Sequence, residues 1–174
     1  MFASKQQTEW VTRGNMTMKV KIVAVFSICT AFITALGTIA VLPARADDLA
    51  TGMYDGVNRL RQTCGMIGDD PRLTAAAQRH ANDMLTNGVN GHIGSDGSSP
   101  RARMADSGYT GTGYTGEIVY WGTGSAATPS AALDSWMQSP AHRAIIQDCA
   151  FTAGGFATAW DGTKMTAVGD FAGP

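Results

Sequence analysis

The chain has 174 residues, enough for one domain with a hydrophobic core and short for two, and its 13 basic and 14 acidic residues give a formal net charge of −1. Five of the basic residues and one acidic residue lie in the first 46 positions, so residues 47–174 keep 8 basic and 13 acidic residues, a net charge of −5. This balance argues against a nucleic-acid partner, whose phosphates need Lys and Arg, and Lys164 as the sole lysine after position 46 argues against a polybasic lipid-binding patch.

The first 46 residues have the order of an export leader. Lys19-Val20-Lys21 precedes an uncharged, largely apolar run over residues 22–42, and Ala44-Arg45-Ala46 provides an A-x-A cleavage site. A retained membrane anchor is the alternative, because 21 helical residues are long enough to cross a bilayer. The polar residues before position 16 fit a leader poorly, so we expect the true start at Met16 or Met18. The sequence therefore predicts a secreted domain over residues 47–174, or a membrane-anchored form with the same domain outside the cell.

Cysteine usage agrees with export. Cys29 lies in the leader, which leaves Cys64 and Cys149 after position 46, and two cysteines in an oxidising compartment most simply form one disulfide. Closing so long a loop contributes roughly 4 kcal/mol in the chain-entropy model. A zinc or thiol-redox site needs a different cysteine spacing.

Helix starts are marked by prolines that directly follow a capping residue. Proline suits the first helical position because its missing N–H has no partner there, and Asp, Ser or Thr before it caps the turn. The four pairs are Asp70-Pro71, Ser99-Pro100, Thr128-Pro129 and Ser139-Pro140. An earlier helix is indicated by apolar residues spaced three or four apart from Leu49 to Cys64, with Gly65 as its end. The helix after Asp70 is expected to end at Asn87-Gly88.

Strand formers concentrate in three stretches, residues 117–121, 155–160 and 164–171. Asp161-Gly162 between the last two predicts a tight hairpin turn. The glycine-rich segments 88–98 and 108–116 are expected to be loops. Helices first and an antiparallel hairpin last predict an α+β domain in which helices pack on a sheet.

Four polar residues outside the expected core are candidates for chemistry. His92 lies in a glycine-rich loop, with Asp96 four residues later, and Glu117 is the only glutamate after position 46. His142 takes the third helical position after Ser139, where the helix dipole favours the neutral ring that a metal ligand or proton acceptor needs. Spacing alone does not bring these four together. His80, on the inner face of its helix, is expected to be a packed, hydrogen-bonded structural residue.

A succession of short motifs runs through residues 49–171 in a characteristic order. The motifs are Asn58-Arg59-Leu60-Arg61, Leu73 to Met84 with His80-Ala81, His92-x-x-x-Asp96-Gly97, Arg103-x-x-x-x-Gly108-Tyr109, Gly116-Glu117 and Trp136-Met137-x-Ser139-Pro140-x-His142-Arg143. In this the sequence resembles the bacterial branch of the CAP superfamily, the SCP-like extracellular domains related to cysteine-rich secretory proteins, antigen 5 and plant pathogenesis-related proteins.

The resemblance implies an α-β-α sandwich with an antiparallel central sheet and a cleft that gathers two histidines and two acids. Carried over by motif, this cleft tetrad is His92, Asp96, Glu117 and His142. It also implies that the two histidines can bind Zn²⁺ or another divalent metal, with no other cofactor expected. Trp136 is then expected to be a packing residue, and Asn58 and Arg61 structural hydrogen-bonders. Ile118 departs from the family, which usually has asparagine after the glutamate, and this removes a polar group near the cleft.

Ligand binding is the function that this combination favours. Some members of the family that the sequence resembles bind sterols, other lipids or divalent metal. The resemblance therefore implies a small hydrophobic ligand, a metal ion or a cell-envelope or host partner. One alternative is a metal-assisted hydrolase or peptidase, with Glu117 or Asp96 acting as general base on a bound water. A metal-free version would use a nearby serine, although no G-x-S-x-G pattern occurs.

The second alternative is an envelope or host-interaction protein that acts through its surface. The tetrad would then be structural, because buried polar groups must be paired. Four aromatic residues would form the contact surface: Tyr109, Tyr114, Tyr120 and Trp121.

Overall fold

A computed structural model describes residues 10–12, 17–19, 41–61 and 63–174 of the chain. The chain divides into two units, residues 1–34 and 35–174. Of the first unit, strand β1 (Trp10–Thr12) is paired antiparallel with β2 (Thr17–Lys19). Most of the predicted leader, with the apolar run up to residue 40 and Cys29, lies outside the described residues.

The second unit holds helices and strands in the order that the sequence suggests. Its helices are α1 (Val41–Leu60), α2 (Pro71–Asn87), α3 (Pro100–Asp106), α4 (Pro129–Gln138) and α5 (Pro140–Ile146), with a 3₁₀ turn η1 (Gly124–Ala126). Its strands are β3 (Gly68–Asp69), β4 (Thr115–Thr123), β5 (Ala153–Trp160) and β6 (Lys164–Ala172). The predicted α+β class is confirmed.

All four helices expected after a capping residue begin at the proline. Asp70 accepts a hydrogen bond from the amide of Arg72, Ser99 from that of Ala102 and Thr128 from that of Ala131, which satisfies otherwise free N–H groups. Helix α2 ends where expected, with Gly88 in the left-handed conformation at φ 70°. Helix α1 starts eight residues before Leu49, so Ala44-Arg45-Ala46 lies in its first turns.

The four strands form one sheet in the order β3-β5-β6-β4. Strands β5 and β6 form the expected hairpin, with Gly162 at φ 106° and the carboxylate of Asp161 accepting from the amides of Thr163 and Lys164. Strand β4 pairs antiparallel with β6, whereas β3 pairs parallel with β5. The sheet is therefore mixed and not purely antiparallel. Two residues of β3 are too few to leave a periodic pattern in the sequence.

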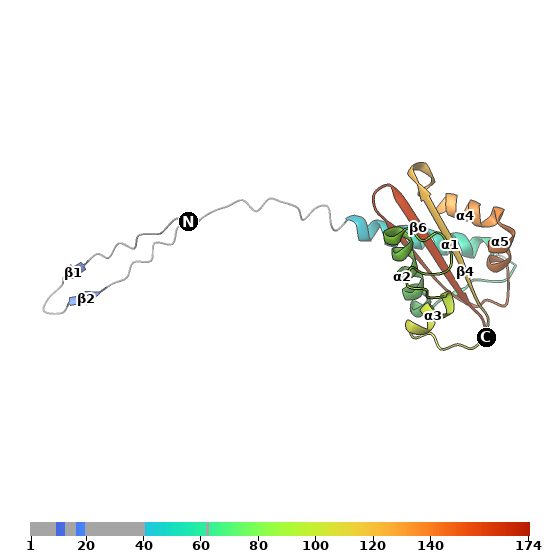
Figure 1. Ribbon diagram of the computed structural model, residues 1–174, viewed down its shortest axis with the longest axis horizontal. Helices are drawn as coiled ribbons and strands as arrows, with labels where there is room; N and C mark the ends of the chain where they lie inside the picture. Colours follow the sequence, from blue (N-terminus) through green and yellow to red (C-terminus); the bar gives the residue numbers. More distant parts are fainter. Residues whose placement is uncertain (1–9, 13–16, 20–40, 62) are drawn as a thin grey trace. The chain divides into compact units, whose positions relative to one another are not determined.

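Helices cover both faces of this sheet, as in an α-β-α sandwich. Figure 1 shows α2 and α3 on one side of β4 and β6, and α4 and α5 on the other. Side chains alternate along the strands, so Ile118 of β4 packs in a core cluster with α1, α4 and α5, while Val119 packs with α2. Strand β4 is at the edge of the sheet, where the two helical layers approach each other around it.

Helix α2 lies unusually close to the hairpin at Gly155. A Cβ atom there would overlap the backbone of Leu73 and Thr74 in the first turns of α2. Only glycine allows this approach, which holds the helix that carries His80 directly against the sheet.

Hydrogen bonds connect the end of α1 to the last residue of α5 and the segment that follows it. Arg61 is 1% exposed and its guanidinium donates to the carbonyl oxygens of Ile146, Asp148 and Phe151. Asn58 accepts from the amide of Ile67 at 2.8 Å. Three residues beyond Arg61, Cys64 forms a disulfide with Cys149, which confirms the predicted pairing.

No helix in the part of the chain that the structure describes is long and apolar enough to cross a bilayer. The start of α1 instead packs on the hairpin. The hydroxyl of Thr158 donates to the carbonyl of Ala46 at 2.7 Å, and the Arg45 guanidinium lies 4.4 Å from the ring centroid of Trp160.

Candidate functional site

Two buried residues form hydrogen bonds to the main chain of the loop that carries His92. His80 of α2 is fully buried and its Nε2 is 2.8 Å from the carbonyl oxygen of Gly91. Arg103 of α3 donates to the carbonyl oxygens of His92, at 3.1 Å, and Ser98, at 2.8 Å. Burial lowers the pKa of His80, so its ring is neutral and Nε2 donates to the carbonyl. Both ends of the loop are thus fixed to helices under it.

Glu117 of β4 positions the His92 side chain. One carboxylate oxygen is 2.8 Å from Nδ1 of His92, and the other accepts a hydrogen bond from Arg103, with which it forms an ion pair. Only 5% of Glu117 is exposed, against 46% of the His92 side chain. The carboxylate assigns the proton to Nδ1 and leaves Nε2 of His92 with a lone pair directed away from Glu117.

His142, in the first turn of α5, faces His92 across the edge of the sheet. The two ring centroids are 6.3 Å apart, with an angle of 63° between the planes. Burial and the neighbouring His92 ring lower the pKa of His142, which keeps its imidazole neutral. Two imidazole rings therefore meet at β4 from opposite sides of the sheet.

Asp96 has other partners. Its carboxylate accepts from the amide of Ser98 at 2.9 Å and is paired with Arg79 of α2 at 2.7 Å, and its side chain is 52% exposed. Hydrogen bonds from Ser98 and then Arg79 hold the pKa of Asp96 well below its usual range. The structure thus joins His92, Glu117 and His142, and places Asp96 in a separate surface ion pair.

Asp170 is a member of this cluster that sequence reasoning missed. It lies opposite Glu117 in the β4–β6 ladder and is fully buried, and neither of its carboxyl oxygens accepts a hydrogen bond from a donor within the described part of the chain. Burial, and next the charge of Glu117, raise the pKa of Asp170 well above its usual value. An acid inside the otherwise uncharged run from Met165 to Ala172 was the signal in the sequence.

Two adjoining cavities open beside Glu117. The first, of about 340 Å³, is lined by His92, Ser99, Pro100, Arg101, Thr115, Gly116 and Glu117. The second, of about 220 Å³, shares Arg101 and Thr115 with it and extends to Met104 and Tyr109. The site is thus a groove of mixed polarity that runs from His92 along α3.

Two side chains at this site are candidates to hold a metal ion. In residues 41–61 and 63–174, no group of three or more His, Cys, Asp or Glu side chains is arranged to hold a metal ion. His92 and His142 provide ring nitrogens at the cleft, and Glu117 is hydrogen-bonded to Nδ1 of His92, an arrangement that is usual for metal-bound histidine. The donor set therefore fits a borderline ion such as Zn²⁺ with other coordination positions left to solvent or ligand.

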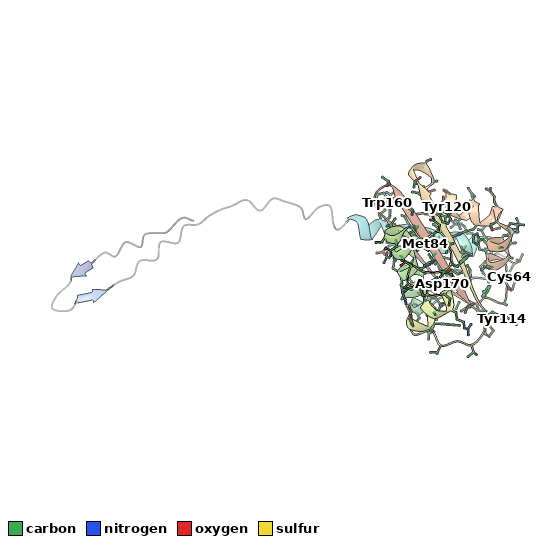
Figure 2. The ribbon with its side chains drawn as sticks, in the orientation of Figure 1. Cys64, Met84, Tyr114, Tyr120, Trp160 and Asp170 are labelled. Atoms are coloured by element: carbon green, nitrogen blue, oxygen red, sulfur yellow. A yellow bond between two sulfur atoms is a disulfide. The ribbon has the colours of Figure 1, made fainter. Side chains whose placement is uncertain are left out.

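Other residues from the family motifs lie away from the cleft. Trp136 is fully buried in the core and its indole N–H donates to the carbonyl of Val119. Ile118 is fully buried in the same core, on the face of the sheet opposite Glu117. The aromatic candidates are dispersed: Tyr114 is 71% exposed at one end of the sheet, while Tyr120 lies toward the other end and donates its hydroxyl to Ala126 (Figure 2).

Comparison with known families gives one match. Residues 54–171 match the model of the cysteine-rich secretory protein family, abbreviated CAP. No curated protein sequence matches the chain at a significant level.

Solved structures share the fold at low sequence identity. The chain is similar to an extracellular protein containing an SCP domain from Bacillus anthracis (20% identity, TM-score 0.67, covering 81% of this chain and 45% of that protein). It is also similar to an outer surface protein from Borrelia burgdorferi (18% identity, TM-score 0.62, covering 73% of this chain and 94% of that protein). A third similar structure is a cysteine-rich secretory protein from Staphylococcus aureus (15% identity, TM-score 0.53, covering 75% of this chain and 40% of that protein). The chain therefore spans less than half the length of the first and third of these proteins.

Proposed function

Because the chain belongs to the CAP family, and its cleft brings two histidines together beside a groove, we propose that it is an extracellular binding module. In this proposal His92 and His142 bind a divalent metal ion, and a ligand occupies the groove beside it. The observation that carries the proposal is the hydrogen bond between Glu117 and Nδ1 of His92, which leaves Nε2 of this ring free of the carboxylate, with the His142 ring centroid 6.3 Å from that of His92.

The surroundings of His92 support metal binding. Arg103 neutralises Glu117 and holds the loop, so the ring does not have to be ordered when an ion binds. The low pKa of His142 keeps a lone pair available near neutral pH. When bound, the ion would supply a Lewis-acidic position for an oxygen donor of the ligand.

The state of the carboxylates favours binding over hydrolysis. A general base needs a free lone pair within reach of the reacting proton. Both oxygens of Glu117 are engaged, by His92 and Arg103, and Asp96 is paired with Arg79. Both acids are therefore engaged with other side chains, which favours binding over hydrolysis.

The lining of the groove favours a ligand with polar groups. The cavity beside His92 is bordered by hydroxyl, guanidinium, carboxylate and main-chain groups. A sterol or fatty acid would leave these polar groups without partners, at a cost in free energy. A ligand with its own hydrogen-bond donors and acceptors fits better.

A location outside the cell is supported by two features. The similar structures are described as extracellular or outer-surface proteins, and the domain carries a disulfide between Cys64 and Cys149. Such bonds persist in oxidising compartments.

Titration calorimetry with Zn²⁺ tests the metal site. The wild type should bind the ion, and His92→Ala and His142→Ala should each weaken binding by at least about tenfold. Asp96→Asn is the matched control and should bind as the wild type does, because Asp96 is paired with Arg79. Absence of binding to the wild type, or wild-type affinity in both histidine variants, would refute the metal site.

A further inference from the structure

Among the strands that the structure describes, only β6 pairs with β4, so one edge of β4 has no strand partner. The register of β4 with β6 determines which main-chain groups point toward that edge. The amide of Gly173 donates to the carbonyl of Tyr114 beyond one end of the β4–β6 ladder, and the amide of Gly124 donates to Thr163 beyond the other. In an antiparallel ladder hydrogen-bonded and non-bonded pairs alternate, so the even-numbered residues of β4 bond to β6. The main-chain groups of the odd-numbered residues therefore point away from the sheet.

The second half of this edge is already covered. The indole N–H of Trp136 donates a hydrogen bond to the outward carbonyl of Val119 at 2.9 Å. Further along, η1 folds back, so that Tyr120 donates to the carbonyl of Ala126 and a Cβ atom on Gly122 would overlap that same carbonyl. This protects the edge against strand addition beyond Glu117.

The first half of the edge is open. Within residues 63–174, which the structure describes without a gap, the outward N–H and C=O groups of Thr115 and Glu117 have no hydrogen-bond partner. The same two residues line the cavity of about 340 Å³ with His92 and Ser99. Unpaired main-chain groups two residues apart, beside a cavity, are complementary to an extended polypeptide.

We propose that Thr115 and Glu117 bind an extended peptide segment of a partner protein, which adds as a strand to β4 and passes beside His92. This inference rests on the proposed binding role of the cleft and names the class of its ligand. Arg101 and Thr115 connect to the second cavity, where Met104 and Tyr109 provide room for a side chain of the peptide. The walls formed by His92 and by Ser99 to Arg101 favour a single strand over the edge of a second folded domain.

The test starts from a phage-displayed library of linear peptides selected on the wild-type protein. The best binder is then synthesised with one main-chain N-methyl group at a time. Strand addition predicts that methylation weakens binding about tenfold at alternate positions and has little effect between them, because every second N–H of the peptide faces β4. A failure to select any binder, or an effect without this alternation, would overturn the proposal.

Two substitutions of the same residue complete the test. Thr115→Pro removes the outward N–H, which an edge strand tolerates, and should weaken the peptide about tenfold, whereas Thr115→Val keeps the N–H and should bind within about twofold of the wild type. Equal peptide binding by the two variants contradicts the proposal. A homodimer on size-exclusion chromatography that dissociates when the peptide is added also contradicts it, because a second copy of this chain would then bind at the edge of β4. Both variants should bind Zn²⁺ as the wild type does. A change in peptide binding without a change in Zn²⁺ binding therefore tests the peptide site separately from the metal site.

Discussion

Glu117 and Asp170 are directly opposite each other on neighbouring strands, and both carboxyl groups are buried. Arg103 is paired with Glu117, and no described residue forms an ion pair with Asp170. Two adjacent carboxyl groups with one arginine are stable when one of them keeps its proton, and the greater burial of Asp170 selects that residue. Burial, and next the charge of Glu117, thus raise the pKa of Asp170, which lies in the sheet between the helical layers (Figure 2).

We predict that Asp170→Asn stabilises the protein at neutral pH. The pKa of Asp170 is raised on folding, so its contribution to stability is present below the unfolded pKa, near 3.8, and is lost as the pH rises toward the folded pKa. Asparagine keeps a donor toward Glu117 and does not ionise in the unfolded chain. Urea denaturation should give a free energy of unfolding higher by about 1 kcal/mol or more at pH 7, and little difference at pH 3. Asp55→Asn, on the exposed face of α1, is the control for charge alone. A loss of stability at pH 7 that disappears at pH 3 would show instead that Asp170 is ionised in the folded protein.

Arg61→Ala should be among the most destabilising single changes in the domain. It would leave the carbonyl groups of Ile146, Asp148 and Phe151 without their donor in a buried position. We expect a loss of about 3 kcal/mol or more in the free energy of unfolding, measured by chemical denaturation. Arg59→Ala, exposed on the same helix, should change it by less than about 0.5 kcal/mol. Similar effects of the two substitutions would contradict the role given to Arg61.

Removal of the disulfide should lower stability without changing the fold. The bond closes a separation of 85 residues, for which the chain-entropy model gives roughly 4 kcal/mol. The Cys64→Ser/Cys149→Ser variant should keep the circular dichroism spectrum of the wild type but unfold at a lower urea concentration. Reductant should shift the wild type to the midpoint of this variant, and a midpoint insensitive to reductant would argue against the bond.

Gly155→Ala tests the contact between α2 and the hairpin. The added methyl group would overlap the backbone of Leu73 and Thr74, which cannot move aside as a side chain can. A loss of about 3 kcal/mol is expected in thermal or chemical unfolding. Gly91→Ala is the matched control, because nothing lies within 4 Å of a Cβ atom there, and it should be close to neutral. A Gly155→Ala protein as stable as the control would mean that α2 is less closely packed than described.

The elements that the sequence predicts well are those specified by neighbouring residues. The four proline starts depend on a cap one position away, and the hairpin depends on Asp161-Gly162 between two strands. Strand β3 was missed because its two residues are held only by β5, more than 80 positions later. Pairing at that distance has no local signature.

The site shows the same division. The order of the family motifs predicts that His92, Glu117 and His142 share one site. In the structure His92 is hydrogen-bonded to Glu117 and its ring lies near that of His142. Asp96 was grouped with them, but Arg79 on the outer face of α2 pairs with it, a contact that depends on how the loop crosses the helix. Asp170 was overlooked because a single acid in a strand resembles any solvent-facing residue until the second helical layer covers it.

The position of Arg61 also bears on how the oxidised protein is made. Its guanidinium gathers the segment from Ile146 to Phe151 against the end of α1, and this segment contains Cys149. These hydrogen bonds form between main chain and side chain and require no oxidant. The same contacts that stabilise the end of α1 therefore place Cys149 beside Cys64, so oxidation of the two thiols requires no further rearrangement of these segments.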